Sequence, residues 1–287
     1  DNGSPNGYSE AKGTSIAVNA TQLLIAGDFT GNNKFDGSGF SDSCASSGCK
    51  FDSNGGTDLF VLRMDKNGDI IQSISAGGSG DDHLTSAILT KDDNAFVGGH
   101  FDSTTLTLGP TNLTNTGGKD AFIAQFTTNN TWGWASKFNS SSDDEISSLT
   151  NHEDSLRFTS IWDSSSNVSI GGNSYSTPSS VQVKQSLYGT ITYDGSFTDI
   201  QAIGTNSGDA EIYHIDSDFP GSTFIVGTFN SFSLTLGNLS FTLGASNFTH
   251  DELFLAHYLD EEDDDDDNDW IKDSVDSCPK GSVSWFS

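Results

Sequence analysis

Basic side chains are scarce in this chain. Its 287 residues include 12 Lys and Arg against 40 Asp and Glu, which gives a formal net charge of −28 at pH 7. Such a surface repels polyanions, and this excludes nucleic acids and anionic membranes as partners. The charge suits divalent cations or a medium of high salt concentration, and simple solubility in a saline setting is the alternative that composition leaves open.

Long apolar runs are also missing. No stretch reaches the roughly 18 consecutive apolar residues that a membrane-spanning helix needs, so we expect no insertion into a bilayer. The sequence begins with neither an initiator Met nor the apolar core of a signal peptide. We therefore expect a processed or excerpted segment of a longer secreted polypeptide.

The familiar catalytic motifs are absent. The sequence has no H-E-x-x-H motif, no G-x-S-x-G elbow and no P-loop, and its six His residues form no spaced metal pair (His83, His100, His152, His214, His250 and His257). We predict no enzyme activity and assign no catalytic residue.

Adjacent carboxylates do occur, at Asp81–Asp82 and Asp143–Asp144, and such pairs can serve glycosidases as acid and base. Both pairs lie at the same position of an internal repeat described below, and Asp209 lies at that position in the third unit. Because a catalytic pair is needed once, we interpret these residues as structural, with side chains that bond nearby backbone N–H groups. Ca²⁺ binding is a lesser alternative, and His83 is expected to be a loop residue with a hydrogen-bond partner.

Apolar residues make up 33% of the chain, Gly and Phe are frequent (31 and 20 residues), and helical periodicity is hard to find. Short alternating or apolar segments bounded by Gly and Asn predict an all-β protein with many strands. Residues 1–13 are predicted to be a loop or the tail of an earlier repeat, and residues 30–57 an insertion. The predicted strand segments are 13–20, 22–29, 58–65, 70–77, 84–90, 94–101, 105–113, 120–126, 131–138, 146–151, 156–162, 180–194, 197–204, 211–216, 222–229, 233–244 and 252–259.

Two sequence marks recur along the chain. An aromatic residue, usually after an acidic one, opens an apolar segment at Phe60, Phe122, Tyr188 and Phe254, with spacings of 62, 66 and 66 residues. A second mark reads SGDDHL at 79–84, SSDDEI at 141–146 and SGDAEI at 207–212, with a weaker NGYSEA at 6–11. Two marks with one period indicate an internal repeat.

Each repeat contains about four strands, which predicts tandem four-stranded antiparallel units. They lie near 14–78, 84–139, 146–206 and 212–258, within one domain spanning 1–258. A small sheet cannot bury its apolar faces alone, so neighbouring units must stack, as in a β-propeller. The ordered motifs over residues 6–258 resemble the SBBP (β-propeller) repeats of bacteria and archaea. Trp132 and Trp134 match that family's returning-strand Trp, whereas the third unit has lost its Asp-x-Phe. Both a closed ring and an open array are compatible with the count.

The fourth unit lacks a returning strand after 252–259, which leaves an unpaired strand edge. Three sources could supply the strand: residues 282–286, residues 1–13, or another subunit by strand addition.

An acidic tail occupies residues 259–287. Carboxylates at alternating positions place oxygens on one side of a tight loop, as Ca²⁺ requires, and Ile271 would add its backbone carbonyl. A solvated acidic linker is the alternative. The predicted ligands are Asp265, Asp267, Asp269, Ile271, Asp273 and Asp276. The stretch is similar to a thrombospondin type-3 repeat, although Trp270 stands where that family has Gly and one copy is present. The resemblance implies that Ca²⁺ binds these Asp residues and that Cys278 pairs with a Cys outside this repeat.

The three Cys and the Asn-x-Ser/Thr triplets indicate a secreted protein. Cys44 and Cys49 could close a small disulfide loop, which leaves Cys278 without a partner in the chain. The triplets could also arise by chance in a chain rich in Asn, Ser and Thr. They lie at Asn2, Asn19, Asn112, Asn129, Asn139, Asn167, Asn238 and Asn247.

These features predict a non-catalytic structural protein of the cell surface. We expect a subunit or segment of an extracellular fibre or adhesin that joins copies of itself, or adjoining segments, by strand addition and Ca²⁺-stiffened linkers. The alternative is a lectin-like module that binds glycans through loops. It requires exposed aromatic residues on one face, with Trp132, Trp134 and Trp162 as candidates, whereas their structural role would be core packing.

Overall fold

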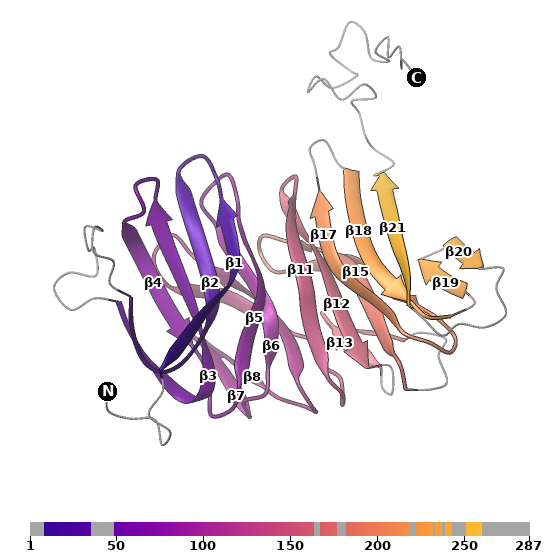
Figure 1. The fold of residues 1–287 in the computed structure, drawn as a ribbon, viewed down its shortest axis with the longest axis horizontal. Helices are drawn as coiled ribbons and strands as arrows, with labels where there is room; N and C mark the ends of the chain where they lie inside the picture. Colours follow the sequence, from indigo (N-terminus) through magenta and orange to yellow (C-terminus); the bar gives the residue numbers. More distant parts are fainter. Residues whose placement is uncertain are drawn as a thin grey trace, which may run out of the picture.

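The computed structural model describes residues 9–35, 49–163, 167–176, 182–217, 222–231, 233–236, 239–242 and 251–259. The described chain consists of antiparallel strands and contains no helix, so the all-β prediction is confirmed. In Figure 1 the sheets stand side by side in sequence order, from the indigo N-terminal sheet to the yellow C-terminal strand.

Four units of consecutive strands make up the row. Unit 1 is the sheet β1-β2-β3-β4, unit 2 is β5-β6-β9-β10, unit 3 is β11-β12-β15-β16, and unit 4 is β17-β18-β21. The bounds are β1 Glu10–Val18, β2 Gln22–Phe35, β3 Cys49–Asp65, β4 Ile70–Ala76, β5 Asp82–Leu89, β6 Ala95–Phe101, β9 Asp120–Phe126, β10 Trp132–Lys137, β11 Asp144–His152, β12 Ser155–Asp163, β15 Lys184–Thr192, β16 Phe197–Gly204, β17 Ala210–Ser217, β18 Ser222–Phe229 and β21 Glu252–Leu259.

A small hairpin is inserted between the second and third strands of units 2, 3 and 4. The hairpins are β7 Thr105–Leu108 with β8 Thr111–Thr114, β13 Val168–Ile170 with β14 Asn173–Tyr175, and β19 Ser233–Leu236 with β20 Leu239–Thr242. Each hairpin pairs with the end of the preceding unit, through Gly77↔Thr107, Asn139↔Ser169 and the pairing of β16 with β19. In segments 105–113 and 233–244, each predicted as one stretch, the described residues form paired strands that connect units.

The first strand of every unit carries a register shift at the same place. Such β-bulges increase local twist and redirect side chains. The shifts lie between Gly13 and Ser15, Leu84 and Ser86, Ile146 and Ser148, and Ile212 and His214. This shared irregularity relates the four units by backbone geometry, independently of the sequence marks.

The cores lie between units. One cluster joins units 1 and 2, a second joins units 2 and 3, and a third joins units 3 and 4. Phe122 packs toward unit 1, whereas the adjacent residues Ala121 and Ile123, on the opposite face, pack toward unit 3. Because strand side chains alternate between faces, the sheets of units 2 and 3 each contribute to two of these cores, and a fourth cluster lies within unit 1.

The structure corrects one of the aromatic marks. Phe60, Phe122 and Phe254 pair with Gly27, Gly99 and Gly227, which are equivalent glycines in their units. In unit 3 this place belongs to Leu187, which pairs with Ser160, and Tyr188 lies on the opposite face toward unit 4. The prediction that Tyr188 matches Phe60 is wrong by one residue, because only the strand face defines the equivalence.

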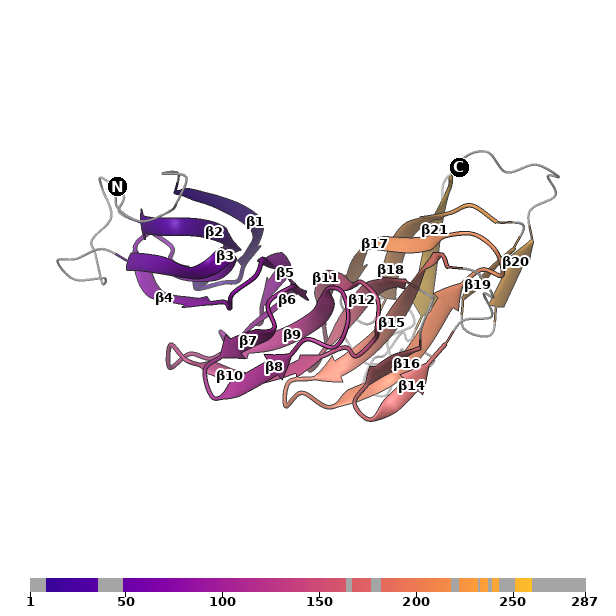
Figure 2. The same ribbon diagram turned by 90° about the horizontal axis from the view of Figure 1, so that it is seen from below.

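Two expectations for unit 1 also change. Residues 10–13 belong to β1 and pair with β2, so they are strand rather than loop. The predicted insertion at 30–57 begins and ends as strand, because β2 continues to Phe35 and β3 starts at Cys49. Figure 2 shows the sheets in a curved row with units 1 and 4 at opposite ends, so the described strands form no closed ring.

Candidate functional site

The junction between consecutive units repeats one hydrogen bond. The first Asp of the second sequence mark accepts a backbone N–H of the preceding unit, from a residue within its third strand or immediately before that strand. The N···O distances are 2.8 Å from Thr57 to Asp81, 3.0 Å from Lys119 to Asp143 and 2.8 Å from Lys184 to Asp209. The predicted bonding of these carboxylates to backbone N–H groups is confirmed, and each bond spans two units instead of closing a local turn.

Close packing at this bond requires a glycine in unit 2. A Cβ on Gly118 would lie 2.1 Å from Asp143 Oδ1, which is shorter than any tolerable contact. Gly118 therefore lets the carboxylate approach the backbone closely enough to accept the Lys119 N–H.

Serine hydroxyls join the first strands of neighbouring units. Ser15 Oγ accepts the backbone N–H of Ala87 at 3.0 Å, and Ser86 Oγ accepts that of Leu149 at 3.0 Å. Ser148 lies at the equivalent place in unit 3, with its Oγ 3.4 Å from the carbonyl of Ile215. These bonds fix the register with which one unit stacks on the next.

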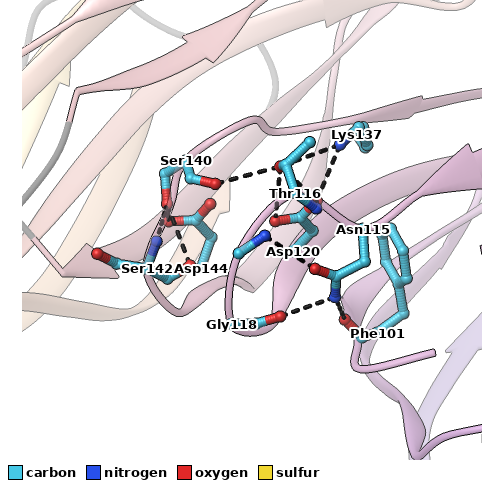
Figure 3. Close-up of polar contacts among 10 residues, drawn as sticks. Phe101, Asn115, Thr116, Gly118, Asp120, Lys137, Ser140, Ser142 and Asp144 are labelled. Carbon is cyan, nitrogen blue, oxygen red and sulfur yellow. Dashed lines mark hydrogen bonds and ion pairs between the residues drawn. The ribbon is translucent and has the colours of Figure 1, made fainter. Parts of the chain in front are cut away.

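A partly buried polar network lies beside the junction of units 2 and 3 (Figure 3). Asp120 Oδ2 accepts the backbone N–H of Thr116 at 2.9 Å and lies 2.9 Å from Lys137 Nζ. Thr116 Oγ1 donates to the carbonyl of Ser140 at 3.1 Å, and Ser140 Oγ lies 2.8 Å from Asp144 Oδ1. The network thus connects the start of β9, the end of β10 and the start of β11.

The two carboxyl groups of this network have different surroundings. Burial raises the pKa of Asp144 from 3.8 to about 8, with the nearby negative charge of Asp120 adding to the shift and the Ser140 hydroxyl opposing it. Asp144 therefore holds a proton at neutral pH, whereas Asp120 is paired with Lys137. Because it is neutral, the Asp144 carboxyl group can remain buried although its Oδ2 has no hydrogen-bond partner among the described residues.

The equivalent carboxyl pair at the junction of units 1 and 2 is Asp58 and Asp82, which are 1% and 0% exposed. Burial raises the pKa of Asp58 to about 6 and also raises that of Asp82. At the junction of units 3 and 4, Gln185 stands in place of the first acid and Ala210 in place of the second. The Gln185 amide accepts from Thr205 N–H and donates to the Gly208 carbonyl, so a neutral group fills the same space.

These networks connect consecutive units. All four carboxyl side chains are buried. Among the residues that the structure describes, no three His, Cys, Asp or Glu side chains are placed to share a metal ion. The carboxyl groups can bind backbone groups of adjacent units. They can exchange protons with solvent only when a junction opens.

His83 and His100 lie on the same side of unit 2, with ring centroids 5.1 Å apart. His83 Nδ1 is 3.0 Å from Asp28 Oδ2, and this hydrogen bond raises the pKa of His83. Burial lowers the pKa of His100 to about 4. His83 thus has the predicted partner, although it lies in strand β5 rather than in a loop.

Trp132 and Trp162 are buried, at 5% and 1% exposure. Trp134 packs against Phe96 and donates its indole N–H to the carbonyl of Tyr193 at 2.9 Å. Their core-packing role is confirmed, and they form no exposed aromatic face.

The last described strand has one paired side. β21 pairs with β18 over eight positions, and no described strand pairs with its other side. In units 1, 2 and 3 the corresponding edge is covered by β4, β10 and β16. Residues 10–13 are already paired within β1 and cannot supply this strand without leaving β2.

Several predicted site residues lie outside the described part of the chain. They include all the predicted Ca²⁺ ligands from Asp265 to Asp276, together with Cys44, Cys278, Asn2, Asn238 and Asn247; for Cys49 only the backbone is described. Asn112, Asn129, Asn139 and Asn167 are exposed. Asn19 is half-buried, and its Nδ2 donates to the Thr90 carbonyl and to Asp93, at 2.8 and 2.7 Å.

Sequence reasoning located the recurring acids but missed the buried network around Asp120 and Asp144. No helix in the described residues is long and apolar enough to cross a membrane. No protein-family model matches the chain, and no curated protein matches it.

Proposed function

We propose that this chain is a non-catalytic structural protein of an extracellular fibre or adhesin, secreted to the cell surface. It joins copies of itself, or adjoining segments of a longer polypeptide, through a strand added to β21 and through linkers stiffened by Ca²⁺. Its units are arranged as in a β-propeller that remains open. The SBBP and thrombospondin type-3 resemblances support this proposal.

The edge of β21 is the observation that carries it. Eight residues of β21 offer backbone groups on a side that its three counterparts use to bind a fourth strand. Backbone hydrogen bonds give such an edge affinity for any extended segment. If the added strand comes from a neighbour in a head-to-tail arrangement, the contact does not close on itself and filaments result.

Electron microscopy of the full chain in Ca²⁺ and in chelator tests the proposal. We expect filaments in Ca²⁺ that loosen in chelator. Filaments indifferent to chelator would keep the assembly and remove Ca²⁺ from it, whereas compact isolated particles in both conditions contradict the fibre.

Hydrogen exchange identifies the strand that mediates assembly. Backbone amides of 252–259 should become protected on assembly, whereas those of 222–229, already held between two strands, serve as the internal control. Unchanged exchange in 252–259 within assembled filaments would place the contact elsewhere.

The glycan-binding alternative depended on exposed tryptophans. Because Trp132 and Trp162 are core residues and Trp134 packs against Phe96, these three tryptophans do not support it.

A further inference from the structure

Unit 4 exposes an apolar face on the side away from unit 3. Leu253 and Leu255 on β21 are 74% and 70% exposed, and Phe224 on β18 and Tyr213 on β17 are 38% and 49% exposed. Val226 pairs with Leu255 and lies on the same face. We call these five residues the unit 4 face.

The equivalent positions in the other units are covered. Leu59 and Val61 of unit 1, and Ala121 and Ile123 of unit 2, are each 0% exposed, because the following unit packs on them. In unit 3 the same strand positions are Ser186 and Tyr188, at 0% and 2%. Three internal junctions therefore bury the positions that unit 4 leaves in solvent.

At the opposite end of the row, strand β1 exposes the matching positions, whereas Phe60 and Leu62 on the same side of unit 1 are buried in a cluster of that unit. Ile16 on β1 is 67% exposed, whereas the residues at its place in units 2, 3 and 4, which are Ala87, Leu149 and Ile215, are 5%, 4% and 1% exposed. Those three pack against the unit before them. Val18, at 68%, lies beside Ile16 on the same face of β1, next to the partly buried Leu23 and Ile25 of β2. We call these four residues the unit 1 face.

We propose that a second copy of this chain stacks its unit 1 face on the unit 4 face, which continues between molecules the junction that the chain repeats three times within itself. The inference deepens the proposed function by naming the partner and the surfaces, and its link to fibres rests on that function. A second copy is the expected occupant because the two faces are complementary. Ile16 of the unit 1 face stands at the strand position whose counterparts in units 2, 3 and 4 pack on the preceding unit at each junction inside the chain. This contact buries side chains face to face and is distinct from strand addition at the edge of β21.

Charge sets the conditions for stacking. At a net charge of −28 two copies repel each other, and salt screens this repulsion while apolar burial persists. Association should therefore strengthen as NaCl is raised from about 0.05 to 0.5 M, where the Debye length falls below about 8 Å.

The test is analytical ultracentrifugation of the full chain and three charge variants in high salt. Wild type should show a mass that rises with concentration above 30.4 kDa. Leu255→Asp and Ile16→Asp each remove one face and should remain monomeric. Asn112→Asp adds the same charge at an exposed position of β8 and should behave as wild type. Unchanged circular dichroism and melting temperature confirm that the variants are folded.

Mixing the two disruptive variants decides the geometry. Leu255→Asp keeps its unit 1 face and Ile16→Asp keeps its unit 4 face, so an equimolar mixture should form a one-to-one dimer that grows no further. A dimer of Ile16→Asp alone would mean that two unit 4 faces pair with each other and would overturn the inference. So would a wild type that stays monomeric at every concentration, or a mixture that does not associate.

Two outcomes distinguish a failure of face stacking from a failure of the proposed fibre. If filaments form equally well from Leu255→Asp, face stacking is wrong and strand addition stands. If wild type forms closed rings without filaments, while Leu255→Asp and Ile16→Asp each stay monomeric, face stacking holds and the fibre is wrong.

Discussion

Leu255 of unit 4 occupies the strand position that Ile123 holds in unit 2, yet Leu255 is 70% exposed and Ile123 is fully buried. Both lie on the third strand of their unit, on the face that points away from the preceding unit. The difference comes from the neighbour, because unit 3 covers Ile123 and no described strand covers Leu255.

This contrast predicts unequal costs for two similar truncations. Ile123→Ala should lower the free energy of unfolding by about 2–4 kcal/mol, because it removes buried methyl groups and leaves a cavity between units 2 and 3. Leu255→Ala, measured by urea denaturation at low protein concentration, should change it by less than about 0.5 kcal/mol. Comparable losses at both positions would show that Leu255 is covered in the isolated chain.

The buried ion pair of unit 2 has an exposed counterpart that serves as its control. Lys137→Met leaves the Asp120 carboxylate buried without its cation and should cost about 3 kcal/mol of unfolding free energy. Lys184→Met breaks a pair with Glu211 whose lysine side chain is 60% exposed, and it should cost less than about 1 kcal/mol. Chemical denaturation of the two variants checks the order, and a Lys137 variant as stable as the Lys184 variant would contradict the structural role of the network.

Stability should fall as the pH rises from 5 to 9. The pKa of Asp144 is about 8 in the folded protein, above its ordinary value of 3.8, so the folded state keeps a proton that the unfolded chain has lost. The stability that this carboxyl group contributes is fully present below about pH 4 and is lost as the pH rises through 8. The raised pKa values of Asp58 and Asp82 act in the same direction.

Asp144→Asn should flatten this dependence, because the amide stays neutral throughout. Urea midpoints at pH 5, 7 and 9 measure it. Asp194→Asn is the matched control, since hydrogen bonds from Thr192 and Ser196 lower the pKa of Asp194 and it titrates below the tested range. Parallel pH profiles for wild type and Asp144→Asn would refute the raised pKa.

Glycosylation should follow exposure. After expression in a host that modifies Asn-x-Ser/Thr sites, peptide mass spectrometry should find glycans among Asn112, Asn129, Asn139 and Asn167, which are exposed. Asn19 should stay unmodified, because its Nδ2 binds the Thr90 carbonyl and Asp93 across the junction of units 1 and 2. A fully occupied Asn19 would mean that this junction forms after modification or not at all.

The sequence by itself determined the strands and their grouping. Alternating apolar residues and turn signals such as Asn67-Gly68 are local, so nearly every predicted segment became a strand, and Gly68 adopts the positive φ of 88° that its turn needs. The recurring Asp81, Asp143 and Asp209 were also visible as structural residues, because their spacing follows the repeat.

Only the tertiary structure decided what these residues bind and which faces are covered. Asp143 bonds a residue 24 positions earlier, and Asp144 becomes a neutral acid because two sheets exclude water around it. Tyr188 was misassigned by one residue because strand faces alternate, and a sequence mark does not state which face it occupies. The same limit applies to Leu255 and Ile16, since an apolar residue in a strand is buried only if another sheet packs on its face.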